Sequence, residues 1–143
     1  MSYSGLIYAI AAAVTWGVVY TIDQRILNDV APQSLLMIDS MLALLFILPI
    51  IAVQKKMIGA IVGLPPNLWL IIVVSQGLSM LASFFIFSGI QKLGASTASI
   101  FEIAYPFFVA IFAYSFLGAR PTTTFLLGAM LVFLGSAVII GFN

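Results

Sequence analysis

The sequence predicts an all-α integral membrane protein with five transmembrane helices. Hydrophobic residues make up 64% of its 143 residues and charged residues only 6%, far outside the range of soluble globular proteins. Five apolar stretches are each long enough to cross the roughly 30 Å of hydrocarbon in a bilayer. Every charged residue except Asp39 and Glu102 falls between these stretches. We therefore expect a single transmembrane domain over residues 1–143.

The five expected spans follow one another with short connections, which force neighbouring helices to run antiparallel. The first stretch resembles a signal peptide in position, but it lacks a basic N-terminal region and is too long, so we expect it to be retained. Pro32 and Pro121 suit the approach to a helix or its first turn, where a missing N–H costs little. The expected spans are residues 4–22, 34–53, 68–90, 95–117 and 123–142.

Several kinds of chemistry are excluded by composition. The sequence contains no cysteine and no histidine, which removes disulfides, thiol chemistry, imidazole catalysis and the usual zinc ligands. Its five basic residues are scattered, so no basic patch indicates nucleic acid as a partner. An intramembrane hydrolase using Asp39 and Glu102 is disfavoured, because no nucleophile and base accompany them. We expect no enzyme activity, no metal and no cofactor.

The distribution of Lys and Arg gives only a weak preference for one orientation in the membrane. Lys55, Lys56 and Arg120 lie on the side of the N-terminus, and Arg25 and Lys92 lie on the other side. One interpretation is insertion in both orientations, or pairing with an inverted partner as in transporters built from inverted repeats. The other is one fixed orientation with the N-terminus inside.

Small residues at regular spacing indicate where helices approach closely in a membrane. Ala9, Ala13 and Gly17 are four residues apart on the first expected span, and Gly128 and Gly135 are seven apart on the fifth. These residues suit either packing within the chain or a dimer interface. On the second interpretation, the fifth span makes the dimer contact.

Glu102 is the first candidate for a functional residue, because an ionisable group at the centre of a span costs about 2.5 to 3.5 kcal/mol on insertion scales. It lies four residues before Pro106, which has no N–H to donate to the carbonyl of Glu102. The sequence therefore predicts a helix kink at Pro106 and a polar cavity beside it. There a carboxyl group could exchange a proton for a substrate or cation. The alternative role for Glu102 is a structural hydrogen bond to a Ser or Thr of a neighbouring helix.

Other polar side chains could line the same cavity, although each also has a plainer interpretation. Tyr105 could donate to the substrate or to the carboxylate, or could pack in the core. Asp39 lies near the start of the second span, where it could simply reach interfacial water or the positive helix end. Thr15, Trp16 and Tyr20 offer hydroxyl and indole groups on the first span, although Trp16 also suits packing.

The order of these features resembles one EamA-type repeat of the drug/metabolite transporter superfamily. The resemblance covers nearly the whole chain. The similar segments are Thr15-Trp16-Gly17, residues 98–106 with Glu102 and Pro106, Leu117-Gly118, and residues 128–135 between Gly128 and Gly135.

This resemblance implies half of an inverted-repeat transporter fold. Most members carry two five-helix repeats in opposite orientation and export amino acids, metabolites or drugs through a cavity lined by both halves. A single repeat implies an antiparallel homodimer, as in the related small multidrug resistance transporters, although those place their essential glutamate on the first helix and this first helix has none. We expect a proton- or ion-coupled exporter of a small solute in a prokaryotic inner membrane. The alternative is a non-transporting subunit or half of a heteromeric carrier.

Two departures from the family pattern concern charge. The family often has an arginine early in the second helix, where this sequence has Asp39. It commonly has a glutamate after the glycine that ends the fourth helix, where this sequence has Ala119-Arg120. The changed charges favour cationic or zwitterionic solutes.

Overall fold

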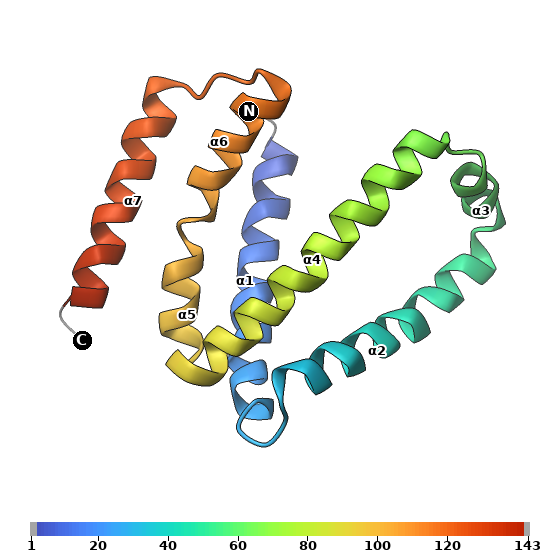
Figure 1. The fold of residues 1–143 in the computed structure, drawn as a ribbon, viewed down its shortest axis with the longest axis horizontal. Helices are drawn as coiled ribbons and strands as arrows, with labels where there is room; N and C mark the ends of the chain where they lie inside the picture. Colours follow the sequence, from blue (N-terminus) through green and yellow to red (C-terminus); the bar gives the residue numbers. More distant parts are fainter. Residues whose placement is uncertain (1–2, 142–143) are drawn as a thin grey trace. The chain divides into compact units, whose positions relative to one another are not determined.

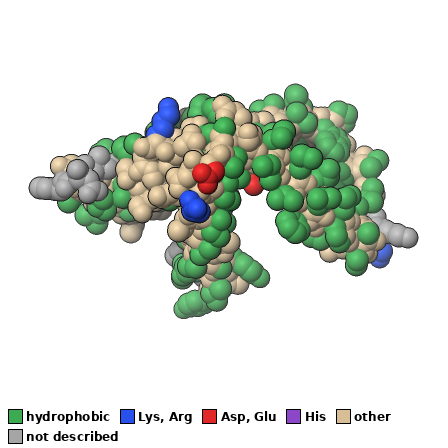
Figure 2. All heavy atoms as spheres, turned by 90° about the horizontal axis from the view of Figure 1, so that it is seen from below, with side chains coloured by type: hydrophobic (Ala, Val, Ile, Leu, Met, Phe, Trp, Pro, Cys, Tyr) green, Lys and Arg blue, Asp and Glu red, His purple; other side chains and the backbone are tan. Residues whose placement is uncertain are grey.

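The computed structural model describes residues 3–141, apart from the side chains of Lys55, Met57 and Ile140. All regular elements in this part of the chain are α-helices, so the predicted fold class is confirmed (Figure 1). The helices form two compact units, which meet in the sequence between Lys92 and Leu93. Hydrophobic side chains (green) are spread over the face seen in Figure 2, and charged side chains (blue and red) appear at only a few places. This apolar exterior is what a chain solvated by lipid requires.

The first unit contains four helices. They are α1 (Tyr3–Ile26), α2 (Pro32–Val53), α3 (Lys55–Val62) and α4 (Pro66–Leu93). Pro32 occupies the first turn of α2, where no N–H is needed, and Pro49 lies inside α2 without ending it. The sequence predicted α1, α2 and α4, but it predicted only a loop where α3 lies.

Buried residues of the first unit lie where α1 ends, α2 begins and α4 ends. Leu27 and Ile90 are each 1% exposed, and Leu35 and Phe87 are also buried. The side-chain amide of Gln91 donates to the carbonyl oxygen of Leu27 at 2.9 Å and is 3.4 Å from that of Val30. These contacts join the turn after α1 to the last turn of α4.

The second unit contains three helices, α5 (Ala95–Glu102), α6 (Tyr105–Leu117) and α7 (Thr123–Gly141). α7 runs back beside α5 and α6 (Figure 1). The rings of Phe107 and Phe133 meet edge to face with centroids 6.1 Å apart, which joins α6 to α7. Gly118 ends α6 with φ of +66°, and its N–H donates to the carbonyl of Tyr114 at 3.1 Å. This left-handed cap favours glycine.

Within residues 3–141, four segments are long and apolar enough to cross a membrane: α1, α2, α4, and α5 with α6 taken together as Ala95–Leu117. The fifth apolar helix, Thr123–Ile139, is shorter. The expected fifth span ended at Phe142, which lies outside the described residues. α1 continues to Ile26, past its expected end, and so includes Asp23.

Most hydroxyl groups on these helices bond to the backbone of their own helix. Thr15, for example, donates to the carbonyl of Ala11 at 2.8 Å, and Ser88 donates to that of Phe84 at 2.8 Å. Such bonds satisfy the hydroxyl group within its own helix, so the side chain can lie in hydrocarbon without a hydrogen-bond partner on a second helix. The same pattern holds for Thr21, Ser40, Ser79, Ser83, Ser115 and Ser136.

Candidate functional site

The candidate site of the second unit is the interruption between α5 and α6. Glu102 is the last residue of α5, and Tyr105 is the first residue of α6. Ile103 and Ala104 lie between them with φ and ψ of −61° and −15°, and of −71° and −16°. These angles are close to those of a 3₁₀ turn. The expected continuous span is therefore two short helices in succession.

Backbone hydrogen bonds around this interruption reach back three residues as well as four. The N–H of Ala104 donates to the carbonyl of Phe101 at 3.3 Å, and the N–H of Phe107 donates to that of Ala104 at 3.1 Å. Pro106 lies in the first turn of α6 and has no N–H to donate to the carbonyl of Glu102. A 3₁₀ stretch in the middle of a helix is typical of a hinge or of a strained segment.

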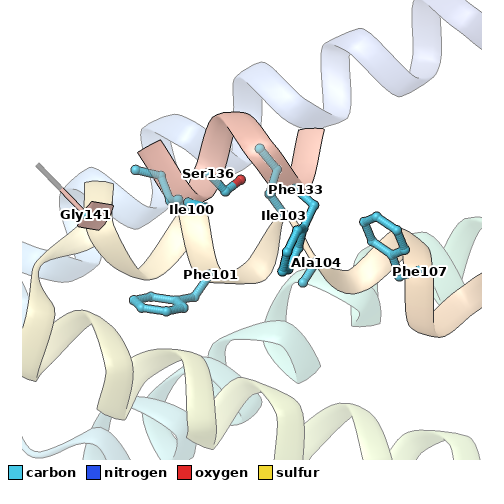
Figure 3. A pocket seen from close by; sticks show the side chains of 9 residues that line it. Ile100, Phe101, Ile103, Ala104, Phe107, Phe133, Ser136 and Gly141 are labelled. Carbon is cyan, nitrogen blue, oxygen red and sulfur yellow. The ribbon is translucent and has the colours of Figure 1, made fainter. Parts of the chain in front are cut away.

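Two apolar cavities border this interruption within the second unit. The larger has a volume of about 360 Å³, and the smaller has a volume of about 320 Å³. Ser136 is the one hydroxyl residue among the lining side chains, and its hydroxyl group already donates to the carbonyl of Val132 at 2.9 Å. The larger cavity is lined by Ile100, Phe101, Ile103, Ala104, Phe107, Phe133, Ser136, Ala137 and Gly141 (Figure 3). The smaller one is lined by Ile103, Pro106, Phe107, Phe125, Gly128, Ala129 and Val132.

Glu102 does not line either cavity, although its neighbours Phe101 and Ile103 do. Its side chain is exposed, as is that of Tyr105. The sequence predicted a polar cavity at this point, whereas the cavities here are apolar. The carboxyl group is therefore near an apolar space rather than inside a polar one.

The first unit holds an acidic residue that the sequence analysis passed over. Asp23 lies on the last turns of α1, is 6% exposed, and has a buried carboxyl oxygen, Oδ2, without a hydrogen-bond partner. The carboxyl group of Asp39 on α2 is close enough for the two charges to interact. Asp23 was assigned to a connection because the first span was expected to end at Ile22. Its position in the sequence could have indicated this. Asp23 directly follows the apolar stretch, so one further turn of the same helix includes it.

The polar residues predicted to share one cavity are divided between the two units. Thr15, Trp16, Tyr20 and Asp39 belong to the first unit, and Glu102 belongs to the second with Tyr105. The rings of Trp16 and Tyr20 are in contact, with centroids 5.6 Å apart. Their grouping around one cavity with Glu102 stays a prediction.

Comparison with known families identifies the chain. The sequence model of the EamA-like transporter family matches residues 3–141. The chain belongs to this family. Searches of curated proteins and of solved structures gave no match. The EamA-like chain is thus a multi-pass membrane transporter of the drug/metabolite superfamily, whose partners are the lipid bilayer and a small solute. The family is one of transporters and is generally not enzymatic.

The small residues singled out from the sequence make no close contacts within their own units. A methyl group built on Gly17, Gly128 or Gly135 would meet no other atom within 4 Å. Ala9 and Ala13 are exposed. Each of these positions is therefore free of close contact within its own unit.

Proposed function

We propose that this chain exports small organic solutes in exchange for protons or another coupling ion, as an antiparallel homodimer in a prokaryotic inner membrane. The observation that carries the proposal is the position of Glu102. It ends α5 inside the apolar segment Ala95–Leu117, at the one place where that segment is interrupted. A carboxyl group there is a natural carrier of a coupling ion, since ionisable groups inside spans are typical of ion and proton pathways.

The location of Glu102 inside an apolar segment supports a second copy of the chain. Ionisable groups inside membrane spans are typically accommodated where they face another protein surface or a water-filled cavity. The open glycines of α7, Gly128 and Gly135, offer a surface where a second backbone could approach closely. An inverted partner fits the weak Lys and Arg bias and the family's inverted repeats.

The side chains around the interruption support a solute with an apolar body and a positive charge. Phe101, Phe107 and Phe133 give the larger cavity aromatic walls. Aromatic rings bind apolar groups and also attract cations. Glu102 directly follows Phe101 in the chain, and a cationic or zwitterionic head group would complement its carboxyl group.

Transport by reconstituted protein tests this function. Purified protein in vesicles with an imposed pH gradient is expected to exchange protons for a lipophilic organic cation. Glu102→Gln is expected to abolish this exchange. The variant should still fold, with the same helical circular dichroism spectrum and the same elution volume in size-exclusion chromatography. Asp29→Asn is the matched control, because Asp29 is an exposed acid in the turn between α1 and α2. Full proton-driven exchange by Glu102→Gln would contradict the assigned role.

The homodimer is tested separately. Reporters fused to the C-terminus, one active only inside the cell and one only outside, are both expected to give signals if the chain inserts in two orientations. Cross-linking at Gly135→Cys is expected to give a dimer of this chain alone. Protein that stays monomeric and inactive, yet co-purifies with one other membrane protein, would instead identify half of a heteromeric carrier or a non-transporting subunit.

A further inference from the structure

α3 (Lys55–Val62) is a short helix between two membrane-crossing helices, and the transport proposal gives it no role. α2 ends at Val53, and α3 begins two residues later after the turn at Gln54, whose N–H donates to the carbonyl of Ile50 at 2.9 Å. At its other end, the N–H of Gly63 donates to the carbonyl of Gly59 at 3.1 Å. α3 is therefore a separate capped helix, joined to α2 through Gln54 and to α4 through residues 63–65.

The length of α3 fixes where it can lie. Its 8 residues make a helix of about 12 Å at a rise of 1.5 Å per residue. A bilayer core is roughly 30 Å thick, so α3 is far too short to cross it. A helix that directly joins the end of one span to the start of the next must lie at the membrane surface.

Helical spacing divides α3 into two faces. Met57 and Ile61 are four residues apart, as are Ile58 and Val62, so these four positions share one side of the helix. Lys56, Gly59 and Ala60 occupy the other side, and Lys55 lies at the boundary between the two faces. Ile58 and Ile61 are 46% and 40% exposed, and Val62 is 74% exposed. At these three positions the apolar face is therefore largely uncovered by the rest of the first unit.

The charge of this region has one sign. Lys55 and Lys56 are adjacent, and the sequence contains no Asp or Glu between Asp39 and Glu102. The Lys56 side chain is exposed. Anionic groups that could pair with these lysines must come from outside the neighbouring chain segments.

We propose that α3 binds the anionic lipids of one leaflet. The helix lies flat in the membrane interface, with its apolar face against the acyl chains and its two lysines among the phosphate groups. An amphipathic helix with lysine on its polar face and aliphatic residues on the other has the chemistry that this position requires. Each lysine near an anionic surface contributes about a five-fold increase in affinity.

The depth of α3 is measured with spin labels on single cysteines, because the chain has no cysteine of its own. Ile58→Cys reports on the apolar face, and Gly59→Cys reports on the polar face of the same turn. In vesicles, the label at position 58 is expected to collide with oxygen, and the label at 59 with a water-soluble nickel complex. Equal access of the nickel complex to both labels would overturn the proposal. Exclusion of both reagents at 58 would also overturn it, because a protein surface would then cover this face.

The preference for anionic lipid is measured by energy transfer from a fluorophore at Gly59→Cys to labelled phosphatidylglycerol or phosphatidylcholine. Phosphatidylglycerol is expected to be enriched around this fluorophore, and high salt is expected to reduce the enrichment. Replacing both lysines, Lys55→Gln with Lys56→Gln, is expected to lower it by up to about 25-fold, at about five-fold per lysine. Lys92→Gln, which removes a charge at the end of α4, is the matched control and should leave it unchanged. Unaltered enrichment in the double variant would overturn the proposal.

Discussion

The side-chain amide of Gln91 donates to the carbonyl oxygen of Leu27 at 2.9 Å. This bond joins the last turn of α4 to the chain just after α1 and lies beside the most buried side chains of the first unit, Leu27 and Ile90. It is a contact between residues far apart in the sequence that does not depend on apolar packing.

Gln91→Leu is expected to lower the free energy of unfolding by about 1 kcal/mol, because the carbonyl of Leu27 loses its donor. Denaturation in mixed micelles, followed by circular dichroism, measures the change. Gln76→Leu is the control, since Gln76 is exposed on the same helix. An equal decrease in the free energy of unfolding in the two variants would show that the bond to Leu27 does not contribute to stability.

Asp23→Asn is expected to stabilise the protein. The carboxyl oxygen Oδ2 of Asp23 is buried without a partner, and Asp39 adds a second charge of the same sign nearby. A neutral amide of nearly the same shape removes the cost of burying that charge. Its melting temperature in detergent should rise, while that of Asp29→Asn, an exposed acid in the following turn, should not change. A lower melting temperature for Asp23→Asn would indicate that the carboxylate is held by a favourable interaction.

Pro106→Ala is expected to restore an N–H that can bond to the carbonyl of Glu102 and so make α5 and α6 more continuous. Spin labels on Ser96→Cys and Ser115→Cys, one on each helix, measure the effect. Pulsed electron paramagnetic resonance gives the distance between the two labels. Their separation should lengthen toward the value for a continuous helix, about 1.5 Å per residue, and its distribution should narrow. Pro121→Ala lies beyond α6 and serves as the control. An unchanged distance would mean that the interruption is imposed by contacts other than the proline.

Gly118→Ala is expected to destabilise the protein by about 1 kcal/mol, because alanine is strained at a positive φ. Gly118 has φ of +66°, whereas Gly135 lies within α7 and has open space around it. Gly135→Ala should therefore be neutral or slightly stabilising as a monomer, since alanine favours a helix. Unfolding midpoints of the two variants, measured side by side, distinguish these outcomes.

Much of the fold could be predicted from sequence because each span requires about 20 apolar residues, a constraint that few other structures share. The positions of α1, α2 and α4 follow from that requirement. α3 was missed because an eight-residue stretch that begins with two lysines, and is followed by Pro65-Pro66, has the composition of a connection.

The candidate site was less predictable, since burial depends on contacts between distant segments. Sequence placed Glu102 near Pro106, and both lie at the interruption between α5 and α6. It gave no indication that the adjoining cavities would be lined by phenylalanine side chains from α5, α6 and α7. Asp23 was passed over because α1 extends one turn beyond its apolar stretch, and only the folded unit buries that turn.

The interruption at Ile103 and Ala104 also has an electrostatic consequence that does not depend on side chains. Aligned peptide dipoles give a helix about half a positive charge at its N-terminus and about half a negative charge at its C-terminus. A continuous span keeps both ends at the membrane surfaces, but here the C-terminal end of α5 and the N-terminal end of α6 lie within one apolar segment. The two facing ends carry opposite partial charges, so they leave a local backbone dipole at the interruption, and this dipole does not depend on the protonation of Glu102.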